Sequence, residues 1–273
     1  MPDVRRPARS LPRRTIILGC LSAAMVVHPD TRADRPVSPA TSKTLTLADL
    51  PPVPDELRDL IDQNVLVFLV GGTRPSLNDS VRSTGRQDRR FDGETQFRLS
   101  YKFNSRCQWS VMREPDKPDT VQRLAVKVRF QQIRLKVGHQ IWLREIPDLE
   151  TFWDSPLVRH EFDHVRISSD RRIESLFNEA VRRHQRIELS KSESEPFIAI
   201  AYRKLNASSR RGTLLSHLSS EDAKPFVKNA VQAEFDRIVQ LLEIRYAELD
   251  RATDHGRLPV PDTGPISDWL ESR

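Results

Sequence analysis

The chain has 273 residues, enough for one large domain or two small ones. Apolar residues make up 37% of it, and 19 prolines stand against 9 glycines. This composition excludes a wholly disordered protein and indicates a folded middle with irregular ends. The net charge is +6, of which residues 1–33 carry +4, so the rest is nearly neutral. Because no run of Lys and Arg is interleaved with aromatic residues, we expect no nucleic-acid partner.

The first 33 residues are typical of an export signal. Five arginines between positions 5 and 14 precede the uncharged stretch Thr15–Val27. Thirteen residues suit the apolar part of a signal but are short for a membrane-spanning helix. We therefore expect a signal peptide over 1–33, or an uncleaved signal anchor. The protein would then be exported to the periplasm or the extracellular space, and only this segment would contact the membrane.

A linker and then a sheet are expected next. Residues 34–60 are rich in Pro, Ser, Thr and Asp, which is typical of a linker. Residues 65–70 are all apolar, as in a buried strand. Alternating apolar positions then mark half-buried strands at 97–103, 124–128, 133–137 and 141–143. We expect these strands to form an antiparallel sheet over 62–146.

After Pro147 the apolar period becomes helical. Asp154 or Ser155 can cap a helix that has Pro156 in its first turn and reaches about residue 169. A second helix is expected over 171–188, then a polar interval with an apolar patch at 196–202. A long amphipathic helix follows over about 221–253. The residues from 257 to 273 are expected to form a loose tail.

The first of these helices contains His160-Glu161-Phe162-Asp163-His164. Residues four apart lie on the same face of a helix, so both imidazoles can bind one ion, and zinc is the usual choice. Glu161 lies about 100° away round the helix. It can accept a proton from a metal-activated water, which is the arrangement of metal-dependent hydrolysis. We predict a Zn²⁺ site with His160 and His164 as ligands and Glu161 as the catalytic base.

A catalytic zinc needs a third protein ligand. His255, at the end of the long helix, is the preferred candidate. Asp170 is the second, ten residues after His160, and Glu179 is a third possibility. The alternative is that the five-residue motif arose by chance. The two histidines and the carboxylate would then lie on a solvated helix face and bind no metal.

The chain resembles the bacterial putative secreted zinc-dependent proteases, a domain family of undefined function. The resemblance covers about 64–256. It is most specific at the H-E-x-x-H of 160–164 and in the segment Thr253-Asp254-His255-Gly256, and looser at 71–73, 91–95, 101–107 and Trp153. Leu249 stands where the family has a tyrosine. The resemblance implies a metallopeptidase-like extracytoplasmic protein.

We therefore predict an α+β protein in which a zincin-like metallopeptidase domain spans 61–256. An N-terminal antiparallel sheet comes first, and helices over 155–254 carry the metal site. The expected activity is peptide-bond hydrolysis in a peptide or protein substrate. Two alternatives are a non-catalytic envelope protein that binds a partner and a zinc hydrolase of another amide, such as a cell-wall linkage.

Overall fold

The computed structural model describes residues 42–72, 92–114, 117–207 and 213–271. All of them belong to the compact unit Pro39–Arg273. The predicted signal segment 1–33 lies outside the described residues. Among those that are described, no helix is long and apolar enough to cross a membrane.

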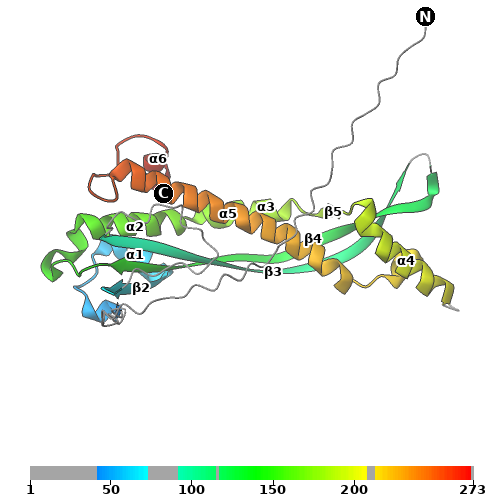
Figure 1. The fold of residues 1–273 in the computed structure, drawn as a ribbon, viewed down its shortest axis with the longest axis horizontal. Helices are drawn as coiled ribbons and strands as arrows, with labels where there is room; N and C mark the ends of the chain where they lie inside the picture. Colours follow the sequence, from blue (N-terminus) through cyan, green and yellow to red (C-terminus); the bar gives the residue numbers. More distant parts are fainter. Residues whose placement is uncertain (1–41, 73–91, 115–116, 208–212, 272–273) are drawn as a thin grey trace, which may run out of the picture. The chain divides into compact units, whose positions relative to one another are not determined.

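The sheet is built on one long antiparallel hairpin, β3 (Gly93–Glu114) and β4 (Lys117–Leu143). On the other edge of β4, β2 (Val65–Val70) pairs in parallel with residues 138–143, and β5 (Arg186–Glu188) pairs antiparallel with 125–127. The short β1 (Lys43–Leu45) adds to β2. Figure 1 shows these strands with the helices packed against them.

The α+β class is thus confirmed, but the predicted sheet differs in two ways. It is not purely antiparallel, because β2 runs parallel to β4, and it is not confined to 62–146, because β1 and β5 lie outside that range. The separate strands expected at 124–143 are one strand. A register shift opposite Asn104 and Ser105 inserts one extra residue into β4. The apolar positions of β4 are therefore even-numbered before this bulge and odd-numbered after it.

Six α-helices are described. They are α1 (Asp55–Gln63), α2 (Pro156–Ser168), α3 (Arg171–Arg182), α4 (Lys191–Ala207), α5 (Lys224–Thr253) and α6 (Pro265–Glu271). Short 3-10 helices lie at Leu47–Asp49, Leu149–Asp154, Leu214–His217 and Glu221–Ala223. Helices α2 and α5 agree with the sequence prediction, whereas α3 ends six residues early and gives way to β5.

Three predicted irregular segments are ordered. Within the expected linker, Leu45, Leu50 and Leu57 are buried. The interval around the apolar patch at 196–202 is helix α4, with Pro196 inside it. The tail predicted to be loose contains α6, where Ile266 is buried. In each segment, side chains that show no clear apolar period in the sequence still reach the core, and packing there orders the chain.

Two apolar clusters hold the fold together. The larger one lies between the inner face of β3 and β4 and helices α3 and α5, and includes Val126, Phe177 and Leu242. The second joins β2, α1 and the 3-10 helix at Leu149–Asp154 to Phe162 and Val165 of α2. Helix α2 contributes Ile167 to the first cluster as well, so it is packed on several sides. This fixes the orientation of the histidine motif that it carries.

Candidate metal centre

The histidine motif lies on α2, which begins where the sequence predicted. Pro156 occupies the first turn of α2, where its missing N–H costs nothing. His160, Glu161 and His164 are all buried. The Nε2 atoms of the two histidines lie 3.2 Å apart. The prediction that both imidazoles share one face of the helix is confirmed.

Asp250 of α5 completes a group of three donor atoms. Its Oδ1 lies 3.1 Å from Nε2 of His160 and 3.1 Å from Nε2 of His164. Among the described residues, these three side chains form the group that could hold a metal ion. Two ligands placed about 2.1 Å from a tetrahedral zinc would lie about 3.4 Å from each other. The observed separations are close to that value.

Thr253 determines which nitrogen of His160 faces the group. The Thr253 hydroxyl donates to the backbone carbonyl of Leu249 at 2.8 Å. Because the hydroxyl hydrogen is used in this bond, the Thr253 oxygen can only act as an acceptor toward His160. It accepts a hydrogen bond from Nδ1–H of His160 at 3.2 Å. With the proton of a neutral His160 on Nδ1, its Nε2 presents a lone pair. That lone pair meets the carboxylate of Asp250, so a cation or a proton must lie between them.

A buried polar chain packs against the second histidine. Nε2 of His139, on β4, lies 2.6 Å from Oγ of Ser168, and the Tyr246 hydroxyl lies 2.8 Å from the same oxygen. The Tyr246 ring stacks obliquely on that of His164, with centroids 4.3 Å apart. The Tyr246 ring, held by its hydrogen bond with Ser168, therefore limits the rotation of the His164 ring. Burial raises the pKa of Tyr246, so its hydroxyl keeps its proton.

Glu161 is enclosed beside the two histidines. Its backbone carbonyl accepts a hydrogen bond from the Thr95 hydroxyl at 3.1 Å. Its Oε2 has no hydrogen-bond partner among the described residues. Gly93 leaves the space for its carboxyl group, because a Cβ there would lie 2.7 Å from Oε1. Burial raises the pKa of Glu161, and the neighbouring His164 and His160 only partly oppose this.

The pKa values of the other two ionisable groups move in opposite directions. Burial favours the neutral form of Asp250, but its polar contacts with the Nε2 atoms of His160 and His164 outweigh burial and lower the pKa of Asp250. Burial also disfavours protonated His164, but its hydrogen bond to Asp250 and the charges of Asp250 and Glu161 raise its pKa. Without a metal, His164 therefore holds a proton more firmly than a free histidine, and a bound cation would replace that proton.

A strained turn after α5 closes this side of the centre. Asp254, His255 and Gly256 all have positive φ angles, of 46°, 59° and 81°. A Cβ on Gly256 would lie 2.7 Å from Cβ of His160, so only glycine fits there. Two consecutive non-glycine residues in the left-handed region are costly, and such strain is concentrated at functional sites.

The three candidates for the third ligand lie in different places. Nδ1 of His255 is 3.4 Å from Oδ1 of Asp250, so His255 borders the group without belonging to it. Its role as a ligand stays a prediction. Asp170 caps α3 and forms an ion pair with Arg172. Glu179 pairs with Arg183 on the exposed side of α3. Neither of these two belongs to the group.

Asp250 was not predicted as a ligand from the sequence. A helical signal was present, because Tyr246, Asp250 and Thr253 are spaced to share one face of α5. Their polar side chains interrupt an otherwise apolar stripe. These side chains reach the histidines only because α5 packs against α2, a contact between residues about 90 positions apart.

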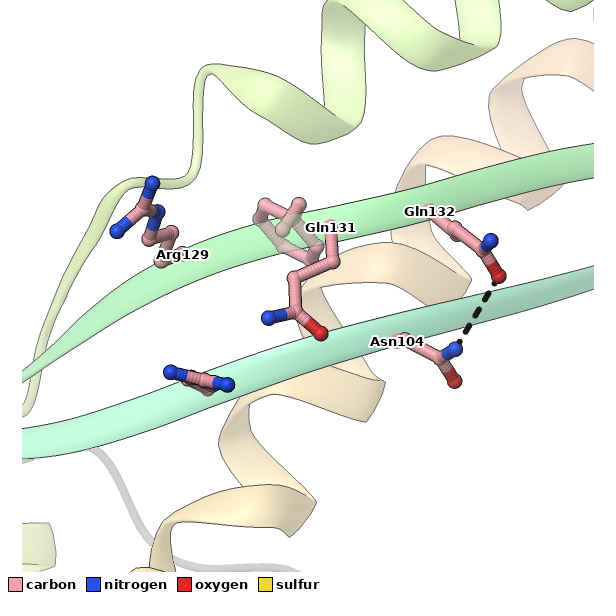
Figure 2. Close-up of a pocket in the computed structure, with 6 residues that line it drawn as sticks. Asn104, Arg129, Gln131 and Gln132 are labelled. Atoms are coloured by element: carbon pink, nitrogen blue, oxygen red, sulfur yellow. Dashed lines mark hydrogen bonds between the residues drawn. The ribbon is translucent and has the colours of Figure 1, made fainter.

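Other aromatic and thiol side chains lie outside the candidate centre. Phe152 and Trp153 are buried in the second apolar cluster. Cys107 is a free thiol, partly buried against the first cluster. Tyr202 is exposed on α4. A polar pocket on the β3–β4 hairpin contains none of the residues of the candidate centre (Figure 2).

Comparison with known proteins adds no relative. The chain matches no protein-family model, no curated protein and no solved structure. The resemblance to secreted zinc-dependent proteases therefore stays an expectation, and any assignment of function depends on the geometry of the centre itself.

Proposed function

We propose that the protein binds a zinc ion through His160, His164 and Asp250 and is a metal-dependent hydrolase, with a peptide bond as its preferred target. The observation that carries the proposal is the convergence of three donor atoms within 3.1–3.2 Å of one another. The adjacent Glu161 carboxyl group is buried, with one oxygen left without a partner among the described residues.

The donor set favours zinc over harder cations. Two imidazole nitrogens and one carboxylate oxygen are typical of a catalytic zinc site, whereas calcium and magnesium take oxygen ligands. The hydroxyl of Thr253 supports the first imidazole in the way that buried metal sites support theirs. The Asp250 side chain is 34% exposed, so solvent and substrate can approach from its side.

Each residue has a separate role. His160, His164 and Asp250 would hold the ion, and Thr253 would orient the ring of His160. When bound, zinc would supply Lewis-acid chemistry by lowering the pKa of water to about 7. Glu161 would take a proton from the attacking water and return it to the leaving amine, which needs a carboxylate without a competing partner. Peptide hydrolysis is preferred because H-E-x-x-H on a helix is the arrangement of metalloproteases.

Metal stoichiometry is the first test. The purified chain should bind one equivalent of zinc, measured by competition with a chromophoric chelator. Substitutions His160→Ala and Asp250→Ala should each abolish tight binding. The control is His184→Ala, because that histidine pairs with Glu234 outside the centre. A His160→Ala variant that keeps stoichiometric zinc would contradict the proposal. His255→Ala shows whether His255 is also a ligand.

The base assignment is tested separately with Glu161→Gln. Glutamine keeps the size of the side chain but cannot accept the proton. Zinc binding should be unchanged, and hydrolysis of an unfolded protein such as casein, or of a mixture of peptides, should fall about 10²–10⁴-fold. An active Gln variant would remove the role of Glu161. If wild-type protein binds zinc but cleaves only cell-wall fragments, the peptide target is wrong and the hydrolase remains.

A further inference from the structure

The β3–β4 hairpin has one face whose side chains are mostly exposed. Odd-numbered residues of β3, such as Phe97 and Tyr101, pack into the first apolar cluster. The even-numbered residues 98–112 therefore point the other way. Their cross-strand partners are the even positions 132–138 and, beyond the bulge, the odd positions 123–129 of β4. We call this surface the outer face.

The outer face is strongly basic. From β3 it carries Arg98, Lys102 and Arg106. From β4 it carries Arg123, Lys127, Arg129, Arg134 and Lys136. All eight side chains are exposed, and no acidic residue stands among these outer-face positions. The whole chain has 44 basic and 38 acidic residues, so the composition alone does not explain this face. The adjacent β5 adds Arg186 and Glu188, which pair with each other.

The arrangement of these charges works against folding. Arg106 lies directly opposite Arg129, and Lys102 directly opposite Arg134. Like charges in directly opposed positions destabilise an antiparallel pair. None of the four forms an ion pair with a described residue. A face selected only for solubility would carry positive and negative side chains together. The surplus of positive charge on the outer face therefore indicates an anionic partner.

The centre of the outer face is hollowed at the bulge. Figure 2 shows this pocket, with Arg129 and Gln131 on β4 and a hydrogen bond of 3.3 Å from Asn104 to Gln132 across the strands. Arg106 also lines it. Amide and guanidinium groups together can donate several hydrogen bonds to phosphate oxygens. The pocket thus places several hydrogen-bond donors, which suit the oxygens of a phosphate group, within a larger basic surface.

We propose that the outer face binds the surface of a bilayer containing anionic phospholipids. Phe130 lines the pocket, but the outer-face positions themselves carry no aromatic side chain. This disfavours single-stranded nucleic acid, because such binding relies on successive bases stacked on aromatic rings. Binding to the surface of an anionic bilayer instead requires many exposed cations on one face of the protein. It does not require an apolar side chain to insert into the membrane.

Vesicle binding tests the proposal, with the full chain and vesicles of phosphatidylcholine with or without phosphatidylglycerol. The double substitution Arg106→Glu/Arg129→Glu should reduce co-sedimentation with the phosphatidylglycerol vesicles at least about tenfold, since each cation near the surface contributes about fivefold. Raising the salt concentration to about 0.5 M should have a similar effect on the wild type.

The matched control is Arg182→Glu/Lys228→Glu, which makes the same change of net charge at exposed positions of α3 and α5. This control should bind the vesicles like the wild type, and zinc binding should be unchanged in both double variants. Equal loss in the two variants would overturn the proposal, as would equal binding to neutral vesicles. Binding of duplex DNA that depends on Arg106 and Arg129, without vesicle binding, would replace the bilayer by nucleic acid.

Discussion

At the scale of single residues, the candidate centre depends on one threonine. The Thr253 hydroxyl donates to Leu249 and accepts from His160, and it also accepts from the backbone N–H of Gly256 at 3.2 Å. It therefore fixes the tautomer of the histidine and the start of the strained turn at once. Both effects come from a side chain that is almost fully buried.

Replacing this threonine should weaken metal binding without unfolding the protein. In Thr253→Val the shape is kept, but Nδ1–H of His160 loses its acceptor and Nε2 is no longer held as the free nitrogen. We expect zinc affinity to fall about 10–100-fold, measured by chelator competition. Thr253→Ser retains the hydroxyl and should bind zinc like the wild type. If the valine and serine variants bind equally well, the hydroxyl does not orient His160.

At the scale of elements, α6 shows how a short helix becomes part of the fold. Ile266 is buried in the first apolar cluster. The ring of Trp269 lies beneath two guanidinium groups, with Arg172 at 4.4 Å and Arg245 at 5.1 Å from its centroid. Each contact of this kind stabilises by about 0.5–2 kcal/mol. Helix α6 thus ties the end of the described chain to α3 and α5.

The contribution of α6 can be measured by urea unfolding. Ile266→Ala removes a buried side chain, and we expect the free energy of unfolding to fall by about 2–4 kcal/mol. Leu258→Ala is the control, because Leu258 is 57% exposed and should change stability by less than about 0.5 kcal/mol. A negligible effect of Ile266→Ala would mean that the segment does not contribute to the core in solution.

At the scale of the whole molecule, stability should depend on pH through a buried histidine. Burial lowers the pKa of His139 to about 4, from an ordinary value of 6.5. Between these values the unfolded chain binds more protons than the folded one. The stabilisation is therefore complete above pH 6.5, decreases as the pH falls, and is lost below pH 4.

The loss in this window should be at most about 3.4 kcal/mol, because each pKa unit corresponds to about 1.36 kcal/mol. Urea unfolding from pH 7.5 to pH 3.5, with a chelator present, would measure it. The His139→Gln variant should have a flatter profile between pH 6.5 and pH 4 than the wild type. Parallel profiles for the two proteins would show that His139 is not held neutral by its burial.

The difference between sequence and structure is clearest in the hairpin. Apolar alternation correctly placed residues of β3 and β4 in strands, because a pleated strand exposes every second residue. It could not reveal that a bulge joins the strands of β4, nor that the intervening positions gather eight cations on one face. Along the chain these cations are separated by apolar residues, and pairing of the strands brings them together.

The sequence by itself determined the α+β class, helices α2 and α5, and the shared helical face of His160 and His164, since each depends on spacing within one element. Only the tertiary structure decided that Asp250 joins the histidines, that Thr253 orients one of them and that Gly256 must be small. These relations arise where α5 packs against α2. Local periodicity carries no information about which distant faces meet, because that is set by how the whole chain buries its apolar surface.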